Sequence, residues 1–289
     1  MAQDTCALRL AGPADASRIE AFLAGDAETS MFLRSNLAEY GLGPSDAAYA
    51  TEMFVDVRGG AVCGVVGLSN GGYLMAQMPM RCDLTPAQKR WQGRKVLGMT
   101  GAPAQVTQVL TALGLADAVT NLDEVEPLYS LELRNLTGPF DALRATRSDD
   151  ANMLERWFFD YRQDTGSTGT DAAAWADARA RAARALSGPG TRILEDNGEP
   201  VAMTTFNAQV ADIVQVGGVF VPRALRNRGY GRRVVAAHLA EARALGISRA
   251  ILFAASQAAA RAYEAIGFQR IGTYRVVLFE PSAKIQGVF

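Results

Sequence analysis

Apolar and polar positions follow one another along the chain in an order that occurs twice. Each half begins with a short apolar strand and a helix, continues with two strands joined by a tight turn, and reaches a fourth apolar strand that ends at a proline. The turn contains Gly59 and Gly60 in the first half and Asn197 and Gly198 in the second, which favours a hairpin in both. A helix, a fifth strand, another helix and a last strand are predicted to complete each half.

These patterns give the range of each predicted element. The hairpin strands are expected at residues 53–57 with 61–68 and at 192–195 with 200–206, and the fourth strands at 73–78 and 213–221. The fifth strands are expected at 96–99 and 250–253, and the helices at 104–113, 171–186, 233–245 and 258–266. Two final strands, 268–271 and 274–279, are predicted with a bend at Gly272 between them.

The beginnings of the two halves also match residue by residue. The matched pairs are Ala7 with Ala142, Arg9 with Arg144, Asp15 with Asp150 and Glu20 with Glu155. Both aspartates precede a predicted helix, where a carboxylate can cap the first turn. A repeat of this length predicts an α+β protein of two domains, residues 1–136 and 137–289, each with a mixed, mostly antiparallel sheet flanked by helices.

A turn rich in glycine and arginine joins the fourth strand of the second half to the next helix. The strand ends with Val219, Phe220 and Val221, and the turn continues through Arg226, Asn227, Arg228, Gly229, Tyr230, Gly231 and Arg232. The first N–H groups of a helix lack internal partners and attract anions, glycine lets the backbone approach a ligand, and arginine adds charged donors. The stretch therefore predicts a phosphate-binding site. It contains neither the Gly-Lys-Ser/Thr of a P-loop nor the third glycine of a dinucleotide fingerprint.

Overall charge and composition narrow the ligand. The net charge of −1 argues against a general binder of nucleic acid or of membrane surfaces, so the five arginines between Arg223 and Arg233 suit one phosphorylated ligand. The single histidine, His238, and three cysteines without metal spacing predict no metal site. No apolar run reaches about 18 residues. We expect a reduced, soluble, cytoplasmic protein, and a structural role for His238.

Two motifs of the second half resemble those of the GCN5-related N-acetyltransferase family. The spacing of Arg226, Gly229 and Gly231 matches the family pattern Arg/Gln-x-x-Gly-x-Gly/Ala, which cradles the pyrophosphate of CoA. About thirty residues later, the chain follows the pattern Asn-x-x-Ala-x-x-x-Tyr-x-x-x-Gly-Phe, with Ser256 in place of asparagine. The residues that match this second pattern are Ala259, Tyr263, Gly267 and Phe268.

The resemblance implies two tandem acyl-CoA N-acyltransferase-like domains, of which the first is a degenerate copy. The first half has no such turn after Pro79, and Leu110 and Pro103 align with Tyr263 and Ser256. In the second half, the resemblance implies that acetyl-CoA is held by the strand end, the turn and Ser256, and that Tyr263 protonates the departing thiolate. It also implies that backbone N–H groups at 219–221 hold the thioester carbonyl where the fourth strand separates from the fifth.

The expected activity is acetyl transfer from acetyl-CoA to an amine, by direct attack. The acceptor, a small molecule or a peptide, and the oligomeric state stay open. Asp212, Glu195 and Glu280 lie at predicted strand ends and are candidate general bases, as is a water chain. Trp157 and Tyr161 could contact the acceptor from the first helix of the second half. The alternative function is a catalytically silent CoA-binding regulatory module.

Overall fold

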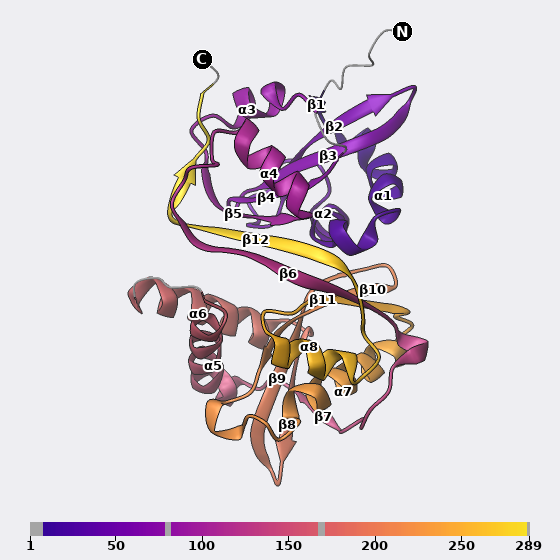
Figure 1. Cartoon of the computed structure of the whole chain (residues 1–289), viewed down its shortest axis with the longest axis vertical. Helices are drawn as coiled ribbons and strands as arrows, with labels where there is room; N and C mark the ends of the chain where they lie inside the picture. The colour runs from indigo at the N-terminus through magenta and orange to yellow at the C-terminus, as the bar shows by residue number, and fades with distance from the viewer. Residues whose placement is uncertain (1–7, 79–81, 167–170, 288–289) are drawn as a thin grey trace. The chain divides into compact units, whose positions relative to one another are not determined.

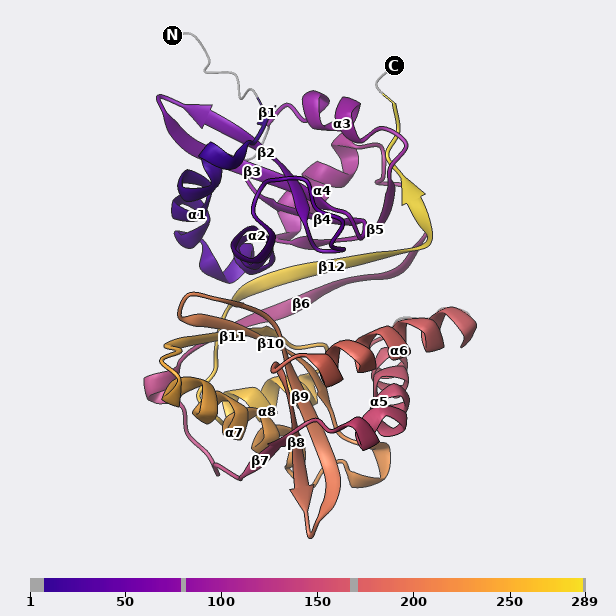
Figure 2. The same ribbon diagram turned by 180° about the vertical axis from the view of Figure 1, so that it is seen from behind.

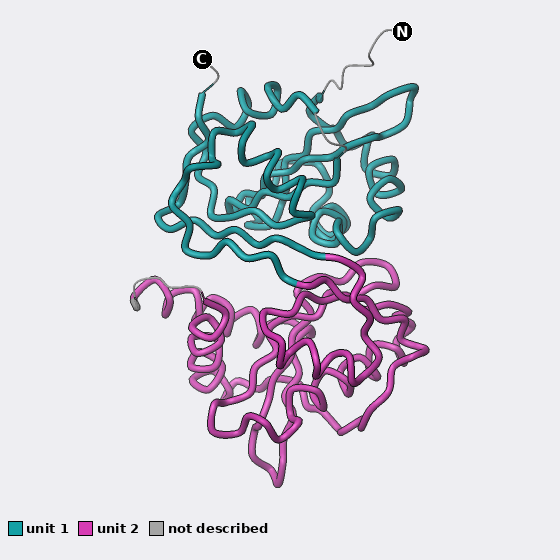
Figure 3. Tube along the Cα trace, in the orientation of Figure 1, with its two compact units in different colours: residues 1–126, 273–289 teal, residues 127–272 magenta. Residues whose placement is uncertain are grey.

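A computed structural model describes residues 8–78, 82–166 and 171–287 of the chain (Figures 1 and 2). The chain forms two compact units (Figure 3). Unit 1 comprises residues 1–126 and 273–289, and unit 2 comprises residues 127–272. In each unit, helices cover both faces of the sheet.

Unit 1 has the strand order β1-β2-β3-β4-β5-β12-β6. The strands are β1 (Leu8–Leu10), β2 (Thr51–Arg58), β3 (Ala61–Ser69), β4 (Tyr73–Gln77), β5 (Lys95–Gly101), β12 (Gln269–Lys284) and the first part of β6 (Thr120–Glu132). The helices are α1 (Ala16–Ala24), α2 (Ala27–Tyr40), α3 (Thr85–Trp91) and α4 (Pro103–Ala112). Consecutive residues of β2 point to opposite faces: Phe54 packs with Trp91 of α3, and Val55 packs with Ile19 of α1.

Unit 2 repeats this plan with the strand order β6-β11-β10-β9-β8-β7. The strands are the second part of β6, β7 (Leu143–Ala145), β8 (Thr191–Asp196), β9 (Glu199–Val210), β10 (Ile213–Phe220) and β11 (Arg249–Phe253). The helices are α5 (Ala151–Asp164), α6 (Asp171–Ser187), α7 (Tyr230–Ala244) and α8 (Gln257–Glu264). Helices α7 and α8 cover one hydrophobic core and α5 and α6 cover the other.

The predicted order of elements is confirmed in both halves. The hairpin turn at Asn197 and Gly198 has φ values of 53° and 81°, as a two-residue turn of this type requires. The predicted strands 268–271 and 274–279 are wrong in one respect, because β12 runs through Gly272 without a break. Helix α7 begins at Tyr230 rather than at the predicted residue 233.

The last strand of each half joins the sheet of the other half. The end of β6 pairs antiparallel with β11, and β12 pairs antiparallel with β5. The compact units therefore differ from the predicted domains 1–136 and 137–289. An apolar pattern predicts that a segment is a strand but does not say which sheet the strand joins, so this exchange had no signal in the periodicity.

The repeat at the start of the two halves produces the same ion pair twice. Arg9 donates to both carboxylate oxygens of Asp15 at 2.8 and 2.6 Å, and Arg144 does the same to Asp150 at 2.7 and 2.9 Å. Each aspartate also accepts a backbone N–H three residues before it, from Gly12 or Arg147. In both halves, this ion pair links the first strand to the first helical turn.

We expect Asp150→Asn to lower the free energy of unfolding by about 1.5–3 kcal/mol, because the Asp150 carboxylate is buried and accepts hydrogen bonds from a charged partner. Asp15→Asn should cost less, because Arg9 is 49% exposed whereas Arg144 is 14% exposed. Urea denaturation of the two variants at pH 7 measures both effects. An equal or larger loss for Asp15→Asn would contradict this assignment.

Candidate functional site

The sheet of unit 2 opens between β10 and β11. The two strands pair in parallel at Ile213, Val214 and Gln215. Beyond Gln215, β10 stays paired with β9 as far as Phe220, and the described ladder between β10 and β11 has no further pair. One backbone edge of residues 216–220 therefore lacks a strand partner. The Val216 carbonyl accepts the Gln215 side-chain amide at 2.7 Å, and the groups that follow can pair with a ligand, because strand N–H and C=O groups need partners.

Two glycines make this opening possible. The ladder between β9 and β10 shifts register after Gln215 and again after Gly217, so β10 bulges there. A Cβ on Gly217 would lie 1.9 Å from the Asn207 amide nitrogen, and Gly218 has a φ of 56°. Neither glycine was predicted as a site residue, although consecutive glycines inside an apolar strand indicate a bulge or the close approach of a ligand or another backbone.

The arginine-rich turn leads directly into the N-terminus of α7. Asn227 and Gly229 have φ values of 63° and 80°. Gly229 is the N-cap of α7 and has no side chain that could accept the first N–H groups of the helix. The N-terminus of a 15-residue helix thus offers backbone donors and the positive end of its dipole. This geometry suits a phosphate group.

The arginines of the turn have different partners. Arg223 and Arg226 both donate to Asp164, the last residue of α5, and Arg226 also donates to the Val221 carbonyl at 3.1 Å. Arg233 donates to Asp141, at 2.6 Å for the shorter bond. Arg228 and Arg232 have no carboxylate partner among the described residues.

Other predicted donor-binding residues have structural partners of their own. Tyr230 is buried and its hydroxyl donates to Asp196, so only its backbone is available at the turn. Ser256 is the N-cap of α8, where its hydroxyl oxygen accepts the Ala259 N–H at 3.2 Å. Each of the two side chains therefore has a structural partner within the chain.

Tyr263 lies on α8 in the same hydrophobic cluster as the end of β10. This cluster also includes Val219, Val221 and Leu225. The ring of Tyr263 is 8% exposed and meets the ring of Phe268 edge-on, with centroids 6.0 Å apart. The structure thus brings together the tyrosine of one motif and the strand end that leads to the other. Proton donation by Tyr263 remains a prediction.

The candidate general bases all have hydrogen-bond partners. Glu195 accepts from Arg144, and Asp212 accepts from Ser248. Glu280 belongs to unit 1, where it accepts from Asn121 at 2.9 Å. These contacts do not single out one of the three carboxylates as the general base. Trp157 packs against Phe220 with centroids 5.7 Å apart, so its ring belongs to the core between α5 and β10.

His238 is buried between α7 and β9, as a structural role requires. Its ring stacks on Phe206 with centroids 3.7 Å apart. Burial lowers the pKa of His238 to about 3, with a smaller contribution from the positive charge of Arg192. The imidazole is therefore neutral in the folded protein at neutral pH, and its buried Nδ1 has no hydrogen-bond partner.

This shifted pKa predicts how stability depends on pH. Because the unfolded His238 binds its proton at about pH 6.5 and the folded one only near pH 3, acidification favours unfolding across this window. At pH 5 the loss should be about 2 kcal/mol relative to pH 7. Urea denaturation of wild type and His238→Phe from pH 7.5 to 4.5 isolates this contribution, since phenylalanine preserves the ring stacking. Parallel pH profiles of the two proteins would refute the assignment.

The corresponding region of unit 1 differs in its described part. Residues 79–81, which follow β4, lie outside the described residues. The next helix, α3, has only 7 residues, and its N-cap is Leu84. Leu110, the counterpart of Tyr263, is buried in the core of unit 1. Neither the long helix nor the tyrosine of unit 2 therefore has an equivalent here.

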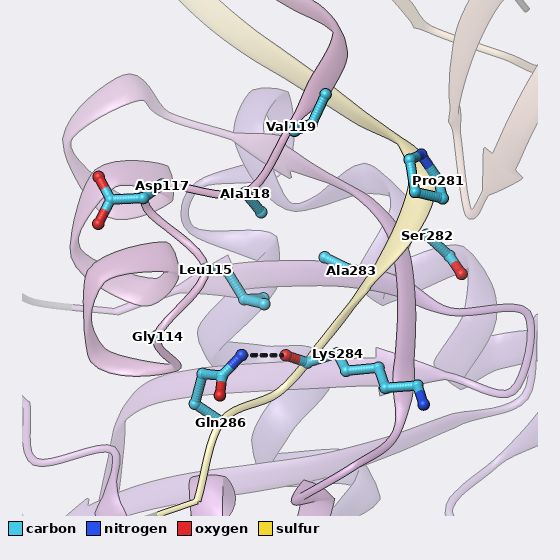
Figure 4. Close-up of a pocket in the computed structure, with 10 residues that line it drawn as sticks. All are labelled: Gly114, Leu115, Asp117, Ala118, Val119, Pro281, Ser282, Ala283, Lys284 and Gln286. Atoms are coloured by element: carbon cyan, nitrogen blue, oxygen red, sulfur yellow. Dashed lines mark hydrogen bonds between the residues drawn. The ribbon is translucent and has the colours of Figure 1, made fainter.

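Unit 1 contains a cavity of about 360 Å³ between the end of α4 and β12 (Figure 4). It is lined by Gly114, Leu115, Asp117, Ala118, Val119, Pro281, Ser282, Ala283, Lys284 and Gln286. Its charged lining residues are one acid and one base. The Gln286 amide donates to the Lys284 carbonyl at 3.3 Å, so part of the polar lining is satisfied internally.

Cys82 is disulfide-bonded and Cys63 is a free thiol, so the expectation of reduced cysteines is wrong for Cys82. Within residues 8–78, 82–166 and 171–287, no three His, Cys, Asp or Glu side chains are grouped so as to hold a metal ion. No helix in the described parts of the chain is both long and apolar enough to cross a bilayer.

Solved structures share the fold of the whole chain. A Drosophila protein is 15% identical with a TM-score of 0.61, and the match covers 94% of this chain and 98% of that one. A GCN5-related N-acetyltransferase from Sphaerobacter thermophilus is 14% identical with a TM-score of 0.51, over 100% and 98%. A tandem GNAT protein from the clavulanic acid biosynthesis pathway is 14% identical with a TM-score of 0.50, over 98% and 99%.

Comparison with protein families gives a match inside unit 2. A search of curated proteins found no match. The model of the acetyltransferase (GNAT) family matches residues 151–268, a range that includes the strand opening, the arginine-rich turn and α8. The chain therefore has the α+β fold of two tandem acyl-CoA N-acyltransferase-like domains, and residues 151–268 belong to the acetyltransferase (GNAT) family.

Proposed function

We propose that unit 2 transfers an acetyl group from acetyl-CoA to an amine. The family assigns acyl transfer to residues 151–268. The observation that carries the finer proposal is the opening after Gln215, because it leaves one edge of β10 without a strand partner just before the N-terminus of α7. A pantetheine arm can pair with this edge while its pyrophosphate lies at the helix N-terminus.

The proposed reaction is direct attack of a neutral amine on the thioester carbonyl. The carbon–nitrogen bond forms, the carbon–sulfur bond breaks, and the amine loses a proton to solvent or to a base. Backbone N–H groups near Val219 and Val221 would stabilise the developing oxyanion, as preorganised donors do in other acyl transfers. Tyr263 would give its phenolic proton to the departing thiolate, since an ordinary tyrosine is protonated at neutral pH.

The acceptor is proposed only as a small-molecule or peptide amine. We further propose that the first half is a degenerate copy that binds no CoA. The short α3 and the core position of Leu110 support this proposal.

Calorimetry with acetyl-CoA, together with release of free thiol in the presence of a panel of amines, tests the function. One acetyl-CoA per chain and amine-dependent thiol release are expected. Binding without thiol release for any amine would favour the silent CoA-binding module, and two bound molecules per chain would contradict the degenerate first half. No binding at all would refute the proposal.

A further inference from the structure

This inference deepens the proposed function and rests on it. Asp164 connects helix α5 to the arginine-rich turn. One carboxylate oxygen accepts from Arg223 at 2.9 Å, and the other accepts from Arg226. Arg226 also donates to the Val221 carbonyl, so its guanidinium lies against the strand end and α5. Two arginines from a single turn therefore share one carboxylate from another element.

The position of Asp164 in its helix favours this arrangement. Asp164 is the last residue of α5, where the helix dipole is negative and a carboxylate is destabilising on its own. The guanidinium groups of Arg223 and Arg226 offset both the Asp164 carboxylate and the negative end of the helix dipole. The Arg223 side chain is 70% exposed and that of Arg226 is 39% exposed, so the pairs contribute little to global stability. Their main consequence is the local position of the turn.

Two other aspartates accept hydrogen bonds from residues at the start of α7. Asp196 accepts the hydroxyl of Tyr230, and Asp141 accepts from Arg233. Arg228 and Arg232 are exposed. In the described structure they are the only arginines from residues 223 to 233 without an aspartate partner. The arginines of this region thus fall into two groups. Three are paired with aspartates, and Arg228 and Arg232 can contact an anion.

We propose that Asp164 is a positioning residue of the acyl-donor site. It holds the turn through Arg223 and Arg226, so that the N–H groups at the start of α7 are preorganised for the pyrophosphate. Arg226, the first residue of the motif, acts here through Asp164 rather than on the ligand. Arg228 and Arg232 supply the cationic contacts to the phosphates. Without Asp164, the competent conformation of the turn is less populated, and the apparent affinity for CoA falls in proportion.

Calorimetry with CoA on the full chain tests this division. Asp164→Asn should weaken CoA binding about 3- to 20-fold and raise the KM for acetyl-CoA similarly. Turnover at saturating acetyl-CoA should stay within about twofold, because Asp164 touches no reacting atom. Arg228→Ala should also weaken CoA binding. The affinity of this variant should depend less on salt concentration than that of the wild type, because a direct phosphate contact, which ions screen, has been removed.

Double variants separate positioning from ligand contact. Combining Asp164→Asn with Arg226→Ala should cost little more than the worse single variant, whereas combining it with Arg228→Ala should give additive losses. Glu155→Gln is the matched control, because Glu155 is also an ion-paired carboxylate of α5 but contacts Arg179 of α6. It should bind CoA as wild type does.

Tighter or unchanged CoA binding by Asp164→Asn would overturn the inference, and tighter binding would show that Asp164 competes with the ligand. Additive losses with Arg226→Ala would also overturn it. Absence of CoA binding by the wild type would refute the proposed function and this inference together. A wild type that binds CoA and an Asp164→Asn variant that behaves identically would refute only the inference.

Discussion

Gly229→Glu is expected to weaken acetyl-CoA binding by more than about 100-fold. Gly229 is the N-cap of α7, so the new carboxylate would lie where the pyrophosphate of the donor is proposed to bind. Like charges brought together at a binding site cost several kcal/mol, and about 2.8 kcal/mol corresponds to 100-fold. The φ of 80° at Gly229 adds backbone strain of about 1–2 kcal/mol for any residue with a Cβ.

Two control variants separate charge from strain. Gly229→Ala introduces the same strain without the charge, and its Cβ would lie 3.4 Å from the Arg232 guanidinium, an ordinary contact. Its loss of affinity should stay below about tenfold. Gly246→Glu places the same residue near the C-terminal end of α7, also at positive φ and in open space. It should bind acetyl-CoA normally, and a similar loss in Gly246→Glu would assign the effect to destabilised α7 rather than to the ligand site.

Much of the fold could be predicted because its signals are local. Apolar periodicity gave nearly every strand and helix, and the turn residues gave both hairpins. The spacing of Arg226, Gly229 and Gly231 predicted the turn before α7, although the helix begins at Tyr230 rather than at residue 233, and the pattern around Tyr263 predicted α8. Each of these features depends on residues within one or two elements, where sequence spacing and spatial distance agree.

The parts that could not be predicted depend on contacts between distant residues. The exchange of β6 and β12 is a choice between sheets that offer similar apolar edges. Asp164 lies 62 residues from Arg226, and nothing in its own sequence context distinguishes it from a solvated helix end. The ligand-binding role of Arg226 stays a prediction from the motif, and the structure adds its ion pair with Asp164.

The polar contacts of Ser256 and Tyr230 were likewise not predictable from the motifs that contain them. Both were predicted to bind the donor, yet a hydroxyl that caps α8 and a phenol that donates to Asp196 each have a structural partner. A motif fixes which residue types recur at a spacing. It does not separate the residues that contact the ligand from those that build the element around it, and variants that change one atom can make that separation.

Tyr263→Phe removes one oxygen atom and keeps the ring. We expect turnover to fall by about 10²- to 10⁴-fold, the usual contribution of a positioned acid, with acetyl-CoA affinity little changed. The ring packs edge-on against Phe268 within the core shared with Val219 and Val221, and phenylalanine preserves these contacts. Thiol release under conditions where chemistry limits the rate measures the effect.

Tyr274→Phe is the matched control for this variant. Tyr274 is also buried, and its hydroxyl lies 3.2 Å from the Thr100 hydroxyl within unit 1. Loss of this hydroxyl should lower the free energy of unfolding by about 1 kcal/mol and leave turnover unchanged. If Tyr263→Phe behaves in the same way, with normal turnover and only a small change in stability, then Tyr263 is a core residue and the thiolate takes its proton from elsewhere. If turnover falls while acetyl-CoA affinity and stability are unchanged, the Tyr263 hydroxyl acts in the transition state, because neither ground-state binding nor core packing has been lost.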